Sequence, residues 1–382
     1  MQSYRGYARK DGMRIGTISL NINAPDFNYG AVLHSWAFQQ YLGKLNFVEY
    51  TEIIDYTMPK LEGQNLKYPV LTNLKQKHLR RALKYMRNHR LYDIRYKKFC
   101  EFISNNILKS DIKYTQKKLN NAKIDYDCVI CESDVIWSPG FSGGHFDKSF
   151  FMALDSMSNL KRIAYAPSMA DGDLNREQED ELKELLKYPQ FISCRESYEK
   201  EILEKYTDKT ITHVLDPVML LEAGDYDVIT ADKMVKENYL LLYLPVDDNV
   251  ELRKYANQYA KKKGLKVVEI STYLNSKNSE NEICYGAAGI EEFLSLIKNA
   301  EIVFTNSFHA ICFAIIFNIQ FYAFSRAYAG KVKDICNVFE LQERYFEDNI
   351  FRENEPIDYE KVNKIRDELA EKSKKWLISS LQ

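Results

Sequence analysis

Several common features are scarce or missing in this sequence of 382 residues. No apolar run reaches membrane-spanning length, and the amino terminus lacks a signal-peptide pattern, because residues 1–12 are polar and the apolar run 13–20 is short. The net charge is only −1, so bulk electrostatics does not favour nucleic acid. We therefore expect a soluble, cytoplasmic protein with no nucleic-acid partner.

Cysteine is also sparse, and its distribution argues against disulfides and metal centres. The seven cysteines are scattered, odd in number and mostly within apolar runs, which is typical of reduced core residues in a cytoplasmic protein. Cys128 and Cys131 form a C-x-x-C, but they lie inside an expected strand, and no second Cys or His pair stands at zinc spacing. We expect neither a metal nor a bound cofactor.

Expected strands alternate with expected helices, the pattern of parallel sheets covered by crossover helices. The first half has strands at 13–20, 47–54, 127–131, 161–166, 191–194 and 210–215, and helices at 31–43, 176–186 and 197–206. The second half has strands at 239–244, 266–270, 301–305 and 321–324, and helices at 251–263, 289–299, 310–317 and 359–381. With 45% hydrophobic residues, the chain can form two cores.

Proline, glycine and acidic residues cluster at 216–227, which predicts a hinge between two α/β domains. The expected division is a polar lead (1–12), an N-terminal domain (13–221) with a basic helical insertion (60–125), a C-terminal domain (222–350) and a terminal helix (351–382). Such an arrangement favours an enzyme that binds its ligands between the two halves.

The segment Thr305-Asn306-Ser307-Phe308-His309 joins an expected strand to an apolar helix. Ligands of open α/β sheets bind at such turns, where the first N–H groups of the helix favour an anion. A histidine there can transfer protons to or from a phosphate or carboxylate compound. The alternative is a histidine that only caps the helix or fills a polar corner of the core.

Other strand ends of the first half carry candidate ligand residues. Arg195 starts a helix and can bind a phosphate or carboxylate bidentately, or form a salt bridge with a neighbouring carboxylate. Asp134 and Trp137 follow another strand, and Trp137 is either a sugar-stacking ring or a core residue. The loop before Gly30 is a weak phosphate cradle, because it has one glycine and no lysine.

Five motifs together resemble the polysaccharide pyruvyl transferase family. They are Asn28-Tyr29-Gly30-Ala31-Val32-Leu33, Ser133-Asp134-Val135-Ile136-Trp137-Ser138-Pro139, Ala164-Tyr165-Ala166-Pro167-Ser168, Ser193-Cys194-Arg195-Glu196, and Thr305-Asn306-Ser307-Phe308-His309 continuing through Phe317-Asn318. They occur in the family's order within 13–344. The resemblance implies two Rossmann-like domains facing a cleft, similar to GT-B glycosyltransferases, with a C-terminal helix crossing back to the first domain.

The resemblance also implies a reaction. The family transfers the pyruvyl group of phosphoenolpyruvate, a co-substrate, to two hydroxyls of a sugar in a cell-surface glycan or its lipid-linked precursor. The products are a cyclic ketal and phosphate. Two residues of the family carry over, Arg195 as donor clamp and His309 as general acid/base, while Asp134 or Glu196 is an alternative proton source for the methylene carbon.

The remaining site residues divide between the two substrates. For the donor we expect Asn306, Ser307, Phe308, Arg326, Lys331 and Lys333, and for the acceptor Asn28, Tyr29, Gly30, Ser133, Asp134, Trp137 and Ser168. The chain departs from the family at Ser307, where some relatives have arginine; Arg326, Lys331 or Lys333 would replace that cation. It also departs at Glu132, where glycine is frequent, and we expect Glu132 to bind the acceptor or to point away.

Residues 75–98 contain ten Lys or Arg and one acid, interleaved with apolar residues. A basic amphipathic helix of this kind can lie on an anionic membrane surface, which suits a lipid-linked acceptor of a capsule or exopolysaccharide pathway. The alternative is a solvated helix packed on the first domain.

Two other functions fit the same frame. One is a GT-B-type glycosyltransferase that uses a nucleotide sugar, and the other is a non-catalytic glycan-binding member of a capsule assembly complex.

Overall fold

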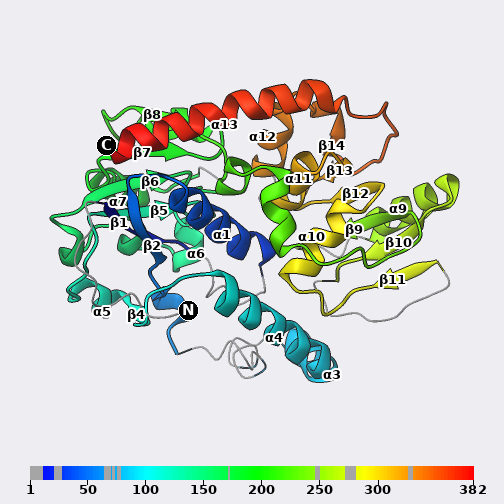
Figure 1. The fold of residues 1–382 in the computed structure, drawn as a ribbon, viewed down its shortest axis with the longest axis horizontal. Coiled ribbons are helices and arrows are strands. Elements are labelled where there is room, and N and C mark those ends of the chain that lie inside the picture. Colours follow the sequence, from blue (N-terminus) through cyan, green and yellow to red (C-terminus); the bar gives the residue numbers. More distant parts are fainter. Residues whose placement is uncertain are drawn as a thin grey trace.

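Two six-stranded parallel sheets form the frame of the computed structural model, which describes residues 12–20, 28–63, 70, 74, 79–170, 173–245, 250–271, 281–325 and 330–382 (Figure 1). The first sheet has the order β2 (Val48–Ile53), β1 (Met13–Ile18), β5 (Cys128–Glu132), β6 (Lys161–Tyr165), β7 (Phe191–Cys194), β8 (Ile211–His213). The second has the order β11 (Glu282–Cys284), β10 (Lys266–Glu269), β9 (Tyr239–Tyr243), β12 (Ile302–Thr305), β13 (Gln320–Phe324), β14 (Tyr345–Phe346). The predicted α/β class with parallel sheets is confirmed.

Runs of apolar residues explain why the central strands form in the interior of each sheet. All five residues of β9, Tyr-Leu-Leu-Leu-Tyr, and all four of β12 are buried, as expected for strands covered by helices on both faces. Strand order reverses between β1 and β5 in one sheet and between β9 and β12 in the other. Such reversal points are where doubly wound sheets bind ligands at their carboxyl ends.

The helices that matter for the site flank these reversal points. They are α1 (Tyr29–Gly43), α8 (Glu199–Leu203), α10 (Ile290–Lys298), α11 (Phe308–Ile316), α12 (Gly330–Val338) and α13 (Tyr359–Leu381). The remaining helices include α3 (Leu79–Arg87), α4 (His89–Asn106), α5 (Gln116–Asn120), α6 (Pro139–Ser142), α7 (Arg176–Leu185) and α9 (Val250–Lys263), and a two-stranded sheet joins β3 (Tyr56–Thr57) to β4 (Tyr114–Thr115). The predicted helix at 359–381 is confirmed, whereas β11, β14 and α12 had no clear signal in the sequence.

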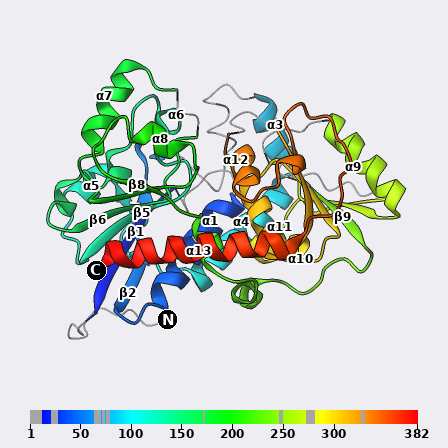
Figure 2. The ribbon, with the colours of Figure 1, turned by 90° about the horizontal axis from the view of Figure 1, so that it is seen from above.

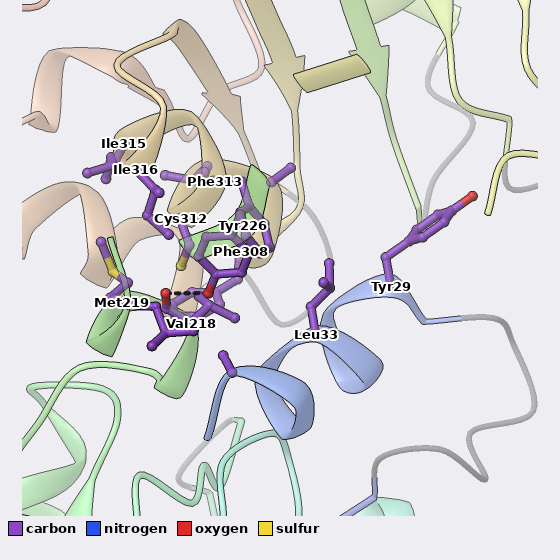
Figure 3. Close-up of a cluster of buried hydrophobic side chains, with 14 of the residues drawn as sticks. Tyr29, Leu33, Val218, Met219, Tyr226, Phe308, Cys312, Phe313, Ile315 and Ile316 are labelled. Atoms are coloured by element: carbon purple, nitrogen blue, oxygen red, sulfur yellow. Dashed lines mark hydrogen bonds between the residues drawn. The ribbon is translucent and has the colours of Figure 1, made fainter. Parts of the chain in front are cut away.

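The first part of the segment predicted as a hinge is packed in the core. Residues 217–220 form the short helix η4 (Pro217–Leu220), all of it buried. Val218 and Met219 of η4 belong to the same apolar cluster as residues of α11 (Figure 3), and Tyr226 donates a hydrogen bond to the Val218 carbonyl at 2.7 Å. The second part is more open, since Glu222, Gly224 and Asp227 are exposed.

The helix α13 crosses from the second sheet back to the first (Figures 1 and 2). Asp358 caps its start, and the Tyr359 hydroxyl donates to the Ala314 carbonyl at the end of α11 at 3.3 Å. Further along, the Ser373 hydroxyl accepts the Leu215 N–H at 2.9 Å, and Lys161 reaches the Leu381 carbonyl at 2.7 Å. The expected return of the terminal helix to the first domain is confirmed.

The basic insertion lies against the second domain rather than only the first. On α4, Lys98 forms an ion pair with Glu292 of α10 at 2.6 Å, and Arg95 donates a hydrogen bond to the Tyr29 hydroxyl. Beyond α4, the helix α3 projects from the body of the molecule (Figure 1). Among the described residues, no helix combines the length and the apolar character needed to cross a bilayer.

The attachment of α13 can be measured with two serines of that helix. Ser373 and Ser380 are both buried and both donate to the carbonyl four residues earlier, but Ser373 also accepts the buried Leu215 N–H. We predict that Ser373→Ala lowers the free energy of unfolding by about 1–3 kcal/mol more than Ser380→Ala, because it leaves that N–H unpaired. Denaturant titration of both variants measures the difference, and equal losses would contradict the attachment.

Candidate active site

Polar side chains from both sheets meet where the carboxyl ends of the central strands face each other. Glu132 ends β5 and residues 133–134 follow it, 195–196 follow β7, Asp216 follows β8, and 306–309 follow β12. Because carboxyl ends of parallel strands lie at one edge of a sheet, the fold brings these four segments together. Arg195 and His309, predicted from separate halves of the sequence, lie on either side of one carboxylate, Asp216.

Asp216 is the most connected polar group of the site. One carboxylate oxygen accepts the Ser133 hydroxyl at 2.6 Å and an Arg195 N–H at 3.3 Å, and it lies 3.6 Å from His309 Nε2. The other accepts the Val218 N–H at 3.1 Å. Burial alone would raise the pKa of Asp216, but His309 and Arg195 outweigh it and hold that pKa far below its usual range. Asp216 is therefore ionised.

Arg195 is buried but incompletely paired. Its Nε donates to Glu196 at 2.7 Å and its Nη1 to Asp216, while its Nη2 has no hydrogen-bond partner among the described residues. The centroid of the Phe308 ring lies 4.4 Å from the guanidinium carbon of Arg195, so the ring packs against one face of the guanidinium group. Arg195 thus forms the alternative salt bridge and still keeps one donor nitrogen for an anion.

His309 occupies the first turn of α11 and faces α1. An added Cβ at Gly30 would lie 2.0 Å from His309 Nδ1, so only glycine at position 30 permits this approach. Burial lowers the pKa of His309, and Asp216 offsets this only in part, so the imidazole is neutral at neutral pH. A neutral imidazole at a helix start is suited to accept a proton.

The start of α11 leaves further donors for a ligand. Ser307 caps the helix by accepting the Ala310 N–H at 3.4 Å, so serine serves there as the N-cap. Both side-chain polar atoms of Asn306 are buried without a hydrogen-bond partner among the described residues. A helix start with an unpaired amide beside it is an anion-binding arrangement.

Asp134 is held in an unusual backbone conformation. Ser133 and Asp134 have φ values of 46° and 55°, in the left-handed region that residues other than glycine rarely adopt. One Asp134 oxygen accepts the Val135 N–H at 2.8 Å, and the other has no partner within the described part of the chain. Burial would raise its pKa, but His34, Lys331 and Arg195 together lower it, so Asp134 is also ionised.

Glu132 and His34 form a buried pair behind these groups. His34 Nδ1 lies 2.6 Å from a Glu132 oxygen, the other oxygen accepts the Ser35 hydroxyl at 2.8 Å, and neither His34 nor Glu132 is exposed to solvent. Glu132 is therefore turned toward α1. His34 and Asp216 are the two site residues that the sequence reasoning missed; Asp216 directly follows an expected strand, which was the available signal.

Two aromatic residues predicted for the acceptor are in the core instead. Trp137 is fully buried, stacked on Phe151 at 4.6 Å, and its N–H donates to the Phe150 carbonyl. Tyr29 is stacked on Phe293 at 4.4 Å, and its hydroxyl donates to the Ala288 carbonyl. Neither ring is open to a sugar, so both predictions were wrong: the large apolar surface of these rings is used between elements.

The other predicted residues divide between site and scaffold. Asn28 caps α1 by accepting the Ala31 N–H at 3.3 Å, and Ser168 is buried with its hydroxyl accepting the Ala170 N–H. Lys331 acts electrostatically on Asp134, so it belongs to the site. Lys333 is exposed and paired with Glu347 at 3.0 Å, away from it. Arg326 lies outside the described residues.

A groove of about 590 Å³ is lined mainly by residues of the first half and by Gly330 of the second, and no residue of the cluster above lines it. Tyr198, Lys205 and Tyr206 line it from one side and Gly330 of α12 from the other. Tyr198 is three residues from Arg195, and Gly330 precedes Lys331. Another hollow, of about 610 Å³, is lined only by α13 residues between 367 and 375 and is remote from the strand ends.

Comparison with known proteins adds two findings. A family model described as polysaccharide pyruvyl transferase matches residues 28–328, which include every site residue above except Lys331 and Lys333. Two structures of the UDP-GlcNAc 2-epimerase from Methanocaldococcus jannaschii are similar. One has a TM-score of 0.52 and 12% identity, covering 94% of this chain and 93% of the epimerase. The other, in complex with UDP-GlcNAc and UDP, has a TM-score of 0.50 and 14% identity, covering 97% and 99%.

At these identities the likeness concerns the fold alone, which is the two-domain GT-B arrangement. No curated protein matches the chain in sequence.

The contact between Gly30 and His309 generates a direct test. We predict that Gly30→Ala lowers the free energy of unfolding by about 1–3 kcal/mol, because the new methyl group forces the imidazole or α1 to move. Gly43, at the other end of α1, has nothing within 4 Å of an added Cβ and is the matched control. Thermal or denaturant unfolding of the two alanine variants measures this; a Gly30 variant as stable as the Gly43 variant would refute the close approach.

Proposed function

Because the chain belongs to the polysaccharide pyruvyl transferase family, an enzyme family, we propose that its donor is phosphoenolpyruvate and its product a cyclic pyruvyl ketal. The pyruvyl group would pass to two hydroxyls of a sugar in a cell-surface polysaccharide or its lipid-linked precursor. The observation that carries the proposal is a group of buried, unpaired polar atoms at the start of α11: Arg195 Nη2, the Asn306 amide and His309 Nε2, which lack hydrogen-bond partners in the described part of the chain.

Phosphoenolpyruvate suits this group of atoms in charge. It carries about three negative charges in one phosphate and one carboxylate, and such groups bind at helix starts and to guanidinium. Arg195 and Lys331 supply the positive charge, and the first turn of α11 supplies N–H groups. The ionised Asp134 and Asp216 stabilise the positive charges of Arg195 and Lys331. They also repel an anion that approaches these carboxylates.

The reaction requires a fixed sequence of proton movements. A proton is added to the methylene carbon, the central carbon becomes electrophilic, and the first hydroxyl forms a C–O bond while losing its proton. The C–O bond to phosphate then breaks, and the second hydroxyl closes the ring. Of the two hydroxyl protons, one balances the proton taken up by the methylene group, and the other leaves on phosphate.

The site residues suit separate parts of that sequence. His309 is neutral and can accept the proton of an attacking hydroxyl, and Arg195 holds the donor. Asp134, whose pKa is lowered by the positive groups around it despite its burial, is ionised and therefore suits hydrogen bonding to an acceptor hydroxyl better than donation of a proton. The groove beside Tyr198 and Gly330 has aromatic and charged lining residues that match a sugar chain, and we place the acceptor there.

The proposal is tested by supplying the purified protein with phosphoenolpyruvate and candidate lipid-linked oligosaccharides. We predict release of phosphate together with an acceptor whose mass has increased by a pyruvyl ketal. His309→Gln and Arg195→Met should each lower kcat/KM about 10²–10⁴-fold. Lys331→Ala should raise the KM for phosphoenolpyruvate, whereas Lys333→Ala, which removes an exposed cation of the same helix, should not.

Replacing phosphoenolpyruvate by nucleotide sugars in the same assay addresses the rival glycosyltransferase. Transfer from a nucleotide sugar without reaction of phosphoenolpyruvate would overturn the proposal. Full activity of the His309 and Arg195 variants would overturn the roles given to these two residues.

We also propose that α3 brings the enzyme to an anionic membrane surface, where a lipid-linked acceptor would lie. Leu79, Leu83 and Met86 follow helical spacing along α3 and are 57–64% exposed. Arg87 and Arg90 beside them are exposed as well. An apolar stripe bordered by cations is complementary to a negatively charged bilayer surface.

Vesicle binding tests this surface. At low salt we predict that phosphatidylglycerol vesicles retain the protein and neutral phosphatidylcholine vesicles do not, since each cation near an anionic surface contributes about 1 kcal/mol. The double variant Leu79→Asn, Leu83→Asn should be retained several-fold less. Val228→Asn removes an even more exposed apolar side chain, at 83% exposure, from another surface and is the control. Equal retention of all three proteins would refute the role of α3.

A further inference from the structure

Two histidines from different halves of the chain lie face to face at the site. His34 of α1 and His309 of α11 have nearly parallel rings, 20° apart, with centroids separated by 6.0 Å. Gly30, one helical turn before His34, is the residue that His309 Nδ1 approaches. One face of α1 therefore supports His309 with a glycine that gives it space and a second imidazole beside it.

His34 differs from His309 in having its own carboxylate. Glu132 Oε2 lies 2.6 Å from His34 Nδ1, and the Ser35 hydroxyl holds the other Glu132 oxygen at 2.8 Å. His34 and Glu132 are both shielded from solvent, and His34 Nε2 has no hydrogen-bond partner among the described residues. Burial raises the pKa of Glu132, and His34 and the Ser35 hydroxyl act against that rise, so a charged carboxylate here depends on the cation that His34 is in position to supply.

Three carboxylates around His34 favour its protonated form. Glu132 and Asp134 face it from the end of β5, Asp216 faces it from the residue before η4, and His309 is the adjacent titratable group on α11. Burial lowers the pKa of His34, but the three carboxylates outweigh it and raise that pKa above its usual value. For His309 the balance is the reverse: burial, assisted by the Arg195 guanidinium, outweighs Asp216 and Asp134 and keeps its pKa below the usual value.

We propose that the two stacked imidazoles together carry a single positive charge. Glu132 keeps that charge on His34, and His309 is thereby kept neutral as the base of the site. The inference deepens the proposed function and rests on it for its kinetic consequence. His34 acts through His309 and is a positioning residue. Two positive charges at this separation in a buried site repel each other, so a charged His34 opposes protonation of His309.

The pair also accounts for Glu132, the carboxylate at the position where relatives often have glycine. In this chain the Glu132 carboxylate is paired with His34 inside the fold, so it does not face the proposed donor. The same arrangement fixes the protonation state of His309 before the substrate binds. It predicts that the acidic limb of the kcat/KM profile, which reports protonation of the base, lies at low pH in the native enzyme.

Three variants test the pair. His34→Gln removes the imidazolium, and Glu132→Gln removes the charge that keeps the proton on it. We predict that both move the acidic limb of kcat/KM for phosphoenolpyruvate upward by about one pH unit, because protonation of His309 is no longer opposed. Ser35→Ala removes only the hydroxyl that helps to keep Glu132 ionised and leaves the His34–Glu132 contact, so it should move the limb in the same direction but by less than either of the other two variants.

Histidine ring NMR provides a readout that needs no substrate. The His34 signal, assigned by its loss in His34→Gln, should titrate above the usual histidine value in the native protein and fall by about 1–3 pH units in Glu132→Gln. His309 should titrate below that value and rise in both variants. A His34 that titrates normally, or an acidic limb unmoved in folded His34→Gln, would overturn the inference. If the protein does not consume phosphoenolpyruvate, the proposed function is overturned. The NMR titration still decides whether His34 carries the charge, because it needs no substrate.

Discussion

The site depends on the position of Asp216 between Arg195 and His309. The carboxylate follows a strand of the first sheet, Arg195 follows the neighbouring strand, and His309 begins a helix of the second sheet. Arg195 supplies the positive charge that stabilises this buried carboxylate, and the Ser133 hydroxyl and the Val218 N–H donate hydrogen bonds to it. The neutral His309 reaches Asp216 from the second half of the chain, and η4, which carries Asp216 at its start, belongs to the same apolar cluster as α11.

Charge compensation also explains why so many ionisable groups share one buried region. Glu132 is paired with His34, Asp134 lies among His34, Lys331 and Arg195, and Glu196 is paired with Arg195. Several polar atoms nonetheless stay unpaired within the described residues, among them Arg195 Nη2 and the Asn306 amide. Native interiors rarely leave such atoms unpaired, and this cluster of them at the strand ends is the feature on which the proposed donor site rests.

The sequence predicted the frame well, because apolar strands such as β9 and β12 and the amphipathic helix α13 have strong periodic signals. It drew attention to Arg195, which directly follows a strand, and to His309, which lies in the first turn of the helix after one, and the fold brings these two residues to the same carboxylate. It missed His34, since a histidine inside a helix shows no sign of the carboxylate that a distant strand brings to it. It misassigned Asp216 because the following proline suggested a linker. Trp137 and Tyr29 failed for a related reason: ring size alone does not distinguish a sugar platform from a core residue.

The crossing helix α13 has a mechanical consequence. Its 23 residues extend about 35 Å at 1.5 Å per residue, and it is bonded near one end to α11 and farther along to the segment that follows β8 and to the first residue of β6. A helix bonded to both bodies in this way resists their separation, so it helps to keep Arg195 and His309, which come from different bodies, at a constant spacing.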